Sequence, residues 1–422
     1  MTSKPQPPSA EVSISSRLIQ LMLLTLVAAA SMYARTAVSP LQEAMRVALG
    51  LGDNQMALLQ GPALALPMIV AAIPLGLLID RVSRVRLLLI FTALSLLGTW
   101  LTAWASTFEL LFAARALVGL SATATGTTAF SLLADLYAPQ QRGRATLVVA
   151  IGQFAGSSLA FALGGAFLGA AIARAQSWQA AMLWLSAPLV IVTLSILAMR
   201  EPVRSERTLL NPSARAAFTQ LWTYRAVIAP LLLGLVTMEV ALQSALVWTA
   251  PALTRGLALS AGRVGQLMGM GLIVSGVVGP LAGGSLADLS QRTGGPRRSM
   301  GVLGALALLS APAALFSVIP DMAAASILVV IFFALITALL VMGTALFTIV
   351  VPNELRGLCL SIFASATLIF GVGLGPLGVS LLSGALGGSA RLGLALSSVG
   401  CMTSVLAAGI FIFGRREFPC IA

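Results

Sequence analysis

The chain contains no histidine, and only three of its 422 residues are cysteines. Without imidazole it can hold no histidine-ligated haem, no histidine metal cluster and no histidine-based catalytic triad. Cys359, Cys401 and Cys420 are scattered and form no C-x-x-C pair, so we interpret them as small apolar helix residues and a tail thiol. We therefore expect neither a metal site nor a cofactor.

Charged side chains and long polar stretches are also scarce. Charged residues make up 9% of the chain, whereas soluble proteins carry about 25%. Apolar residues make up 58%. The longest polar segment, 200–225, is shorter than the roughly 50 residues that an aqueous domain needs. The composition predicts an all-α membrane protein whose chemistry takes place within helices or in short loops.

Apolar windows of about 20 residues, the length of a helix that crosses a bilayer, recur along the whole chain. The twelve expected spans are 17–40, 55–79, 85–106, 109–136, 144–172, 178–199, 226–253, 262–289, 298–318, 322–350, 356–386 and 389–414. The end of the first window, LTLVAAASMYA, could imitate a signal peptide. Its removal would leave eleven spans and spoil the repeat described below, so we interpret it as a membrane helix.

Positive charges are distributed unevenly between the two ends of these spans. With the amino terminus inside, eighteen Lys and Arg residues fall on inner segments and five on outer segments. The outer ones are Arg46, Arg174, Arg255, Arg263 and Arg391. This bias predicts that both termini are cytoplasmic. Because topology explains the net charge of +12, we expect no nucleic-acid partner.

A glycine–aspartate motif occurs twice. GLLIDRVSR places Gly76 four residues before Asp80 at the end of the second span. GSLADLSQR places Gly284 four residues before Asp288 at the end of the eighth span. The two acids are 208 residues apart, and arginines follow each of them. The repetition indicates that the second half of the chain copies the first.

An arginine–glycine motif repeats at nearly the same offset. PQQRGRA, with Arg142, opens the fifth span, and PNELRGL, with Arg356, opens the eleventh, 214 residues later. Two motifs at nearly one offset indicate six duplicated helices, as in transporters built from parallel repeats. The predicted parts are a cytoplasmic tail at 1–16, a six-helix bundle at 17–199, a cytoplasmic linker at 200–225, a second six-helix bundle at 226–414 and a tail at 415–422.

Together these motifs resemble the signatures of the major facilitator superfamily. G-x-L-x-D-R after the second span, RALVG with Arg115 in the fourth, and ADLYAPQQRGRA after it all look like that superfamily. Spinster-like bacterial transporters fit better still, because they place D-x-Q eighteen residues past an arginine of the first helix. This chain has Arg35 followed by Asp53 and Gln55 at that spacing, and VWTAPALTR and GVGLGP fit as well. The resemblance implies two pseudo-symmetric six-helix bundles in a bacterial inner membrane.

The chain departs from that subgroup at two acidic positions. The family usually has Asp where this chain has Ala34, and Glu where it has Ala122. Those acids look like the proton-linked pair of the family. The fifth span also keeps Gly152 and Gly156 but lacks the Gly-Pro of the antiporter-like motif. The resemblance therefore does not extend to proton coupling in the amino-terminal half.

Three charged residues are expected within the membrane. At 1.5 Å per residue, Arg35 lies about 27 Å up the first span, Arg115 about 9 Å below the outer end of the fourth, and Glu239 about 20 Å up the seventh. These spans line the central cavity of the resembled fold, so we expect one shared water-filled space. Alternatively, the arginines snorkel to the outer interface, or Glu239 is a neutral carboxyl hydrogen-bonded to a neighbouring helix. An acid at this depth costs on the order of 2.5–3.5 kcal/mol to insert, so we expect it to partner an arginine or carry a proton.

Two further groups of residues are candidates for function. The weaker cavity candidates are Gln153, Thr127, Gln243 and Ser244. The expected gating residues of the loop motifs are Gly76, Asp80, Arg81, Arg84, Asp135, Arg142, Gly284, Asp288 and Arg356. We expect Asp80 to cap a helix across the interface between the halves and to pair with loop arginines such as Arg142. The alternative is that these acids only terminate helices.

The predicted function is secondary transport of a small anionic or zwitterionic organic solute by alternating access. The resemblance also allows an amphiphile such as a lysolipid. Protons are the candidate coupling ion, membrane lipids surround the protein, and we expect a monomer. The alternatives are an uncoupled facilitator or exchanger, a membrane-embedded lipid-modifying enzyme and a transporter-like sensor. We do not expect the protein to be an enzyme, because the chain has no D-x-x-x-D run and no histidine.

Overall fold

The computed structural model describes residues 14–137, 139–174, 177–199, 201 and 214–418, and every regular element within them is helical. The first half contains α1 (Ile14–Thr36), α2 (Gln42–Ala48), α3 (Asp53–Gln60), α4 (Pro62–Arg81), α5 (Arg84–Trp104), α6 (Phe108–Leu136), α7 (Pro139–Ala173), α8 (Trp178–Leu185) and α9 (Ala187–Ser195). The second expected span is thus divided into α3 and α4. Pro62, which has no N–H to continue a helix, begins α4.

The second half begins within the range that was expected to be a linker. The elements there are α10 (Ala214–Thr223), α11 (Arg225–Leu257), α12 (Ala261–Ala313), α13 (Met322–Val350), α14 (Asn353–Ala366), a π-helical segment (Thr367–Leu374), α15 (Gly375–Ala385) and α16 (Leu392–Gly414). Helix α10 lies inside the expected linker, so part of that connection is helical.

The described residues contain eleven helical stretches that are long and apolar enough to cross a membrane. The longest of them, 261–317, includes the 53-residue α12, whose backbone leaves helical geometry at Gly294 and Gly295. Gly295 has φ 63° and ψ −159°, a conformation that is essentially open only to glycine. Because this break divides α12 into two spans, the twelve expected spans are present.

The surface carries many large apolar side chains. Val70 is 75% exposed, Ile191 69% and Met402 68%. Lipid tails are as apolar as these side chains, so their exposure costs nothing in a bilayer. Many hydroxyls inside the bundle bond to their own helix, as Thr99 does to the carbonyl of Ser95 at 2.9 Å. Bonds of this kind give many polar groups at membrane depth the partner within the protein that a bilayer requires.

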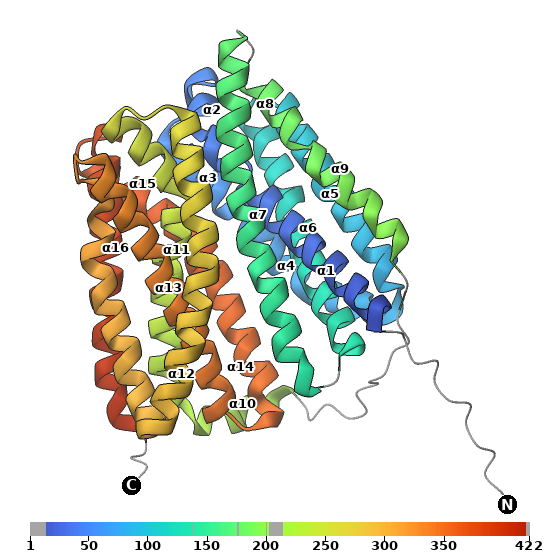
Figure 1. Cartoon of the computed structure of the whole chain (residues 1–422), viewed down its shortest axis with the longest axis vertical. Coiled ribbons are helices and arrows are strands. Elements are labelled where there is room, and N and C mark those ends of the chain that lie inside the picture. Colours follow the sequence, from blue (N-terminus) through green and yellow to red (C-terminus); the bar gives the residue numbers. More distant parts are fainter. Residues whose placement is uncertain (1–13, 138, 175–176, 200, 202–213, 419–422) are drawn as a thin grey trace, which may run out of the picture.

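The two halves meet along a seam in which α7 lies beside α12 (Figure 1). Gly165 of α7 and Gly265 of α12 face each other there, and a Cβ on Gly265 would come within 2.5 Å of the carbonyl oxygen of Phe161. Only glycine allows the helices to approach this closely. The start of α1 and the end of α16 lie at the same end of the molecule, and α2 lies at the opposite end (Figure 1).

The internal repeat is visible in atomic detail at the two arginine–glycine motifs. Arg142 donates from Nε to the carbonyl oxygen of Tyr137 at 3.0 Å. Arg356 donates from Nε to the carbonyl oxygen of Val351 at 3.1 Å. Tyr137 and Val351 are the C-cap residues of α6 and α13. In both halves, therefore, the motif arginine neutralises the carboxyl end of the preceding helix, where a cation is favoured.

Candidate substrate and coupling site

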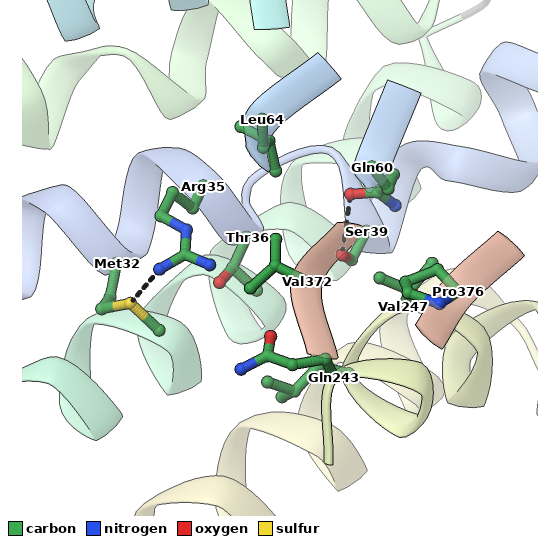
Figure 2. A pocket seen from close by; sticks show the side chains of 11 residues that line it. Met32, Arg35, Thr36, Ser39, Gln60, Leu64, Gln243, Val247, Val372 and Pro376 are labelled. Carbon is green, nitrogen blue, oxygen red and sulfur yellow. Dashed lines mark hydrogen bonds between the residues drawn. The ribbon is translucent and has the colours of Figure 1, made fainter. Parts of the chain in front are cut away.

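A small pocket with both polar and apolar side chains in its wall lies on the seam between the two halves (Figure 2). Its wall is formed by Met32, Arg35, Thr36, Ser39, Gln60, Leu64, Gln243, Leu246, Val247, Val372 and Pro376. The first six come from the amino-terminal half and the other five from the carboxyl-terminal half. The volume is about 30 Å³, enough for water but not for an organic solute. In this conformation the pocket is a constriction between the halves.

Arg35 enters this pocket from the last turn of α1. Its Nη1 donates a hydrogen bond to the thioether sulfur of Met32 at 3.4 Å, and a thioether is a weak acceptor. Its Nε is buried and has no hydrogen-bond partner among the described residues. A guanidinium carries five N–H donors. Arg35 therefore presents unused donors to the space between the halves.

Glu239 lies opposite, on α11. Its Oε2 accepts a hydrogen bond at 3.3 Å from Nε2 of Gln243, one turn further along the helix. Gln243 in turn lines the pocket, and Figure 2 shows its amide on the other side of the space from the Arg35 guanidinium. The charges of Arg35 and Glu239 attract each other, although no direct ion pair joins the two side chains in the described structure. Glu239 itself does not line the pocket, and the hydrogen bond from Gln243 connects it to the wall that Arg35 shares.

The π-helical segment of the eleventh span packs against both halves at this point. A Cβ on its Gly371 would lie 3.4 Å from Cβ of Glu239 and from Cγ of Gln243. On the other side, a Cβ on Gly61 would come within 2.7 Å of the carbonyl oxygen of Gly373. π-helical turns are rare and often occur at functional sites. The π-helical segment therefore contacts Gly61, where the second span is divided, and also α11, the helix that carries Glu239.

Arg115 does not line the pocket, contrary to the expectation that both arginines face the cavity. Its side chain is buried, with the residue only 1% exposed. Nη1 donates to the carbonyl oxygen of Ala34 at 3.3 Å, and Nη2 donates to that of Arg35 at 2.6 Å. These carbonyls belong to the last turn of α1, which has no following N–H groups to pair with them. Arg115 therefore caps α1 and holds the backbone of Arg35, rather than snorkelling to the interface.

The remaining expected cavity residues are spread over several helices. Gln153 is half-buried on α7 and outside the pocket wall, and Thr127 is exposed and bonds to carbonyls of its own helix. Ser244 is buried on α11, and its hydroxyl has no partner among the described residues. The arrangement brings together Arg35, Glu239 and Gln243, but it does not bring Gln153 or Thr127 to them.

Sequence reasoning missed an ion-pair cluster at the end opposite the termini. Arg255, near the end of α11, bonds Glu43 of α2 with Nη2 to Oε2 at 2.7 Å and Nε to Oε2 at 2.9 Å. The same guanidinium bonds Asp53 of α3. Arg46 also pairs with Glu43 at 2.6 Å. Glu43 and Asp53 come from the first half and Arg255 from the second, so the cluster joins the halves.

A family comparison identifies this architecture. A sequence model described as Major Facilitator Superfamily matches residues 24–376, which is most of the chain. The chain belongs to the major facilitator superfamily. A comparison with curated proteins gives no match. The family and the fold are those of a transporter rather than of an enzyme.

Solved structures of major facilitator transporters share the fold across nearly the whole chain. A bacterial homologue of the human lysosomal transporter Spinster, inward-facing and unoccupied, has a TM-score of 0.79 at 20% identity, covering 96% of this chain and 98% of that one. The same homologue, occupied, has a TM-score of 0.78 at 21% identity, with the same coverage. A D-xylose–proton symporter has a TM-score of 0.71 at 14% identity, covering 92% and 97%. The predicted resemblance to spinster-like transporters is confirmed at the level of the fold.

The loop motifs of this major facilitator chain lie at the end of the molecule that holds the termini. Arg84, at the start of α5, is buried and pairs with Asp135 near the end of α6 and with Glu201, whose Oε1 lies 3.1 Å from Nε. Arg84 and Asp135 belong to the first bundle and Glu201 follows it directly, so these ion pairs join α5 to α6 and to the segment after the bundle. Burial would raise the pKa of Glu201, but hydrogen bonds from Ser83 and from the start of α5 outweigh it and hold that pKa below its usual value.

The remaining acidic and glycine residues of the loop motifs lie at the ends of the second and eighth spans. The structure describes neither the surroundings of Gly76 nor the side chain of Asp80, so their gating role stays a prediction. Arg81 and Asp288 are exposed, and Asp288 has no ion pair with a described residue. A Cβ on Gly284 would have open space around it.

Proposed function

We propose that this protein is a secondary transporter that moves a small anionic or zwitterionic organic solute by alternating access between bundles 17–199 and 226–414. Its membrane would be the bacterial inner membrane, with both termini cytoplasmic and a single chain as the working unit. The observation that carries the proposal is Arg35, a guanidinium at the seam whose Nη1 donates to a weak thioether acceptor and whose Nε has no partner among the described residues. A carboxylate or phosphate group would satisfy those donors in the bidentate geometry that arginine favours.

The contacts between the halves support an arrangement that opens toward the cytoplasm. The Arg255 cluster and the Gly165–Gly265 contact join the halves. The motif glycines Gly143, Gly284 and Gly357 have no described atom within 4 Å of an added Cβ. In alternating access, one of the two limiting conformations has the bundles in contact at the outer end and separated at the cytoplasmic end. The solute would then enter from the cytoplasmic side and bind below the pocket, between Arg35 and Glu239.

Glu239 is the proposed coupling group. Ala34 and Ala122 stand where the resembled subgroup has acids, so the first half offers no carboxyl beside Arg35. Glu239 is attracted to Arg35, and a solute that bound the guanidinium would remove part of this attraction and favour proton uptake by the carboxyl. The second candidate function is uncoupled exchange, which the same two alanines favour. An amphiphilic solute remains within the proposed substrate class.

Transport by the purified protein in liposomes tests the proposal. A panel of radiolabelled organic anions and zwitterions, including a lysolipid, is offered with and without a pH gradient. We expect saturable uptake of at least one member, strongly reduced by Arg35→Gln and only partly reduced by Arg35→Lys. Arg391→Gln, an exposed arginine away from the pocket, is the matched control. Equal uptake by Arg35→Gln and the parent would refute the role of Arg35, and accumulation that ignores the pH gradient would favour exchange.

A further inference from the structure

A second, larger hollow lies between α12 and α13, apart from the seam pocket. It has a volume of about 530 Å³, and its wall includes Arg263, Gln266, Met270 and Val274 of α12 together with Ser326 and Val330 of α13. We call it the α12/α13 groove. It shares no lining residue with the seam pocket, and so it is a separate site.

The groove exists because the two helices are held together below it. The helices run in the same direction, since Gly271 of α12 approaches Val330, and further along Gly283 approaches the backbone of Ala338. A Cβ on Gly271 would lie 3.3 Å from Val330, and one on Gly283 would overlap the Ala338 carbonyl oxygen at 2.3 Å. The packing therefore tightens along the pair. The groove is open from the start of the helices down to the level where the glycines bring them together.

One face of each helix lines the groove. On α12 the spacing 263, 266, 270 and 274 follows successive turns of one face, and on α13 Ser326 and Val330 are one turn apart. Arg263 and Val274 are separated by eleven residues, or about 16 Å at 1.5 Å per residue. Half of a hydrocarbon core is about 15 Å. The groove thus has the depth of one lipid leaflet.

Polarity changes along this depth. Arg263 and Gln266 are exposed at the upper end, near the start of α12, and Arg263 forms no ion pair with any residue that the structure describes. Ser326 adds a hydroxyl on the facing helix. Below them the wall is apolar: Met270 is 66% exposed and Val274 46%. A cationic, hydrogen-bonding mouth above an apolar trough complements a molecule with an anionic head and a hydrocarbon tail.

We propose that the α12/α13 groove is a binding site for an anionic phospholipid of the outer leaflet. Its phosphate would lie against Arg263 and Gln266, and one acyl chain would follow the trough over Met270 and Val274. The leaflet follows from the orientation given by the positive charges, and the site itself does not depend on the transported solute. On its opposite side α12 packs against α7 through Gly265 and Gly269. A lipid bound in the groove therefore supports the helix that forms the seam.

Native mass spectrometry of the intact protein with defined lipids tests this site. The probes are phosphatidylglycerol and phosphatidylcholine with identical acyl chains, added to delipidated protein in detergent. We expect the parent to retain phosphatidylglycerol about fivefold better than phosphatidylcholine, the preference that one interfacial arginine provides. Arg263→Gln should lose this preference. Arg391→Gln, which removes another exposed outer arginine, should keep it.

A second variant tests the trough rather than the charge. Val274→Trp replaces a lipid-facing side chain with one that fills the trough while leaving Arg263 in place, so we expect retention of both lipids to fall. Equal retention of the two lipids by the parent would overturn the proposal, as would a preserved preference in Arg263→Gln. A loss of preference in Arg391→Gln as large as that in Arg263→Gln would show a general effect of surface charge. A dimeric mass that Val274→Trp abolishes would show that a second copy, not a lipid, occupies the groove.

Discussion

Arg255 binds Asp53 with two nitrogens, Nη1 to Oδ2 at 2.9 Å and Nη2 to Oδ1 at 2.8 Å. The arginine ends the seventh span and the aspartate begins α3, so one bidentate pair joins the two halves of the chain. Glu43 accepts two more hydrogen bonds from the same guanidinium. In the proposed alternating access this cluster would have to break before the proposed solute site could open at this end, and its strength would set the preference between the two end states.

Removal of the Arg255 charge should shift the protein toward the arrangement that opens at this end. Hydrogen bonds to charged groups contribute about 1.5–3 kcal/mol, so Arg255→Gln should raise the open population by at least about tenfold. The measurement is the rate at which an impermeant thiol reagent labels Ser39→Cys, a pocket position, in a background without the native cysteines. Arg391→Gln serves as control, and an unchanged labelling rate in Arg255→Gln would show that the cluster does not control opening.

Glu239→Gln should separate binding from coupling. Glutamine imitates the protonated acid, so we expect the variant to exchange substrate across liposome membranes at equilibrium but to lose accumulation driven by a pH gradient. Glu109→Gln, at an exposed position in the first turn of α6, removes an acid without touching the seam. A Glu239→Gln protein that still concentrates substrate would make Glu239 structural and the transporter uncoupled, or coupled elsewhere.

Arg115→Gln should destabilise the amino-terminal half. The variant loses the donors that pair with the Ala34 and Arg35 carbonyls in the last turn of α1. Each lost charge-assisted bond should cost about 1.5–3 kcal/mol. The midpoint of thermal unfolding in detergent, followed by intrinsic fluorescence, measures this effect. A midpoint equal to that of the parent would contradict the capping role, and Arg115→Lys should give an intermediate value because lysine lacks the planar fork.

Glu201 should make stability depend on pH in the acidic range. Its pKa in the folded protein lies below the usual value, so its stabilising contacts are fully present above the unfolded pKa of about 4.3 and are lost as the pH falls through the lower folded pKa. We expect Glu201→Gln to lower the unfolding midpoint at pH 7 and to bring it closer to the parent near pH 3. Other carboxyls titrate in both proteins, so the readout is the difference between them. A difference that stays constant over this range would exclude the Glu201 contribution.

Several features of this protein could be predicted from its sequence because they rest on local patterns. The spans follow from apolar windows, since a backbone in lipid must form its hydrogen bonds within the helix. The repeat follows from motif spacing, and the hydrogen bonds of Arg142 and Arg356 show its physical basis. Arg35 and Glu239 stand out because charge at membrane depth is expensive.

The departures from those expectations come from long-range contacts. Gly61 and the π-helical segment meet only because the second and eleventh spans cross. The periodicity of apolar residues within either span does not predict this crossing. Arg115 was expected to face the cavity, because helix rise gives its depth but not the direction of its side chain. Only the crossing of α6 and α1 brings its guanidinium to the carbonyls of Ala34 and Arg35.

The sequence by itself determined the membrane class, the number of spans, the duplication and the presence of three deep charges, because each depends on residues close together in the chain or on a repeated motif. Only the tertiary structure decided which charges meet. Arg255 lies 212 residues from Glu43 and 202 from Asp53, and its ion pairs with them depend on how two bundles pack. The α12/α13 groove likewise depends on glycines that bring two helices together below it. The ion-pair cluster and the groove both depend on packing between segments that are distant in the sequence, and no local sequence pattern predicts such packing.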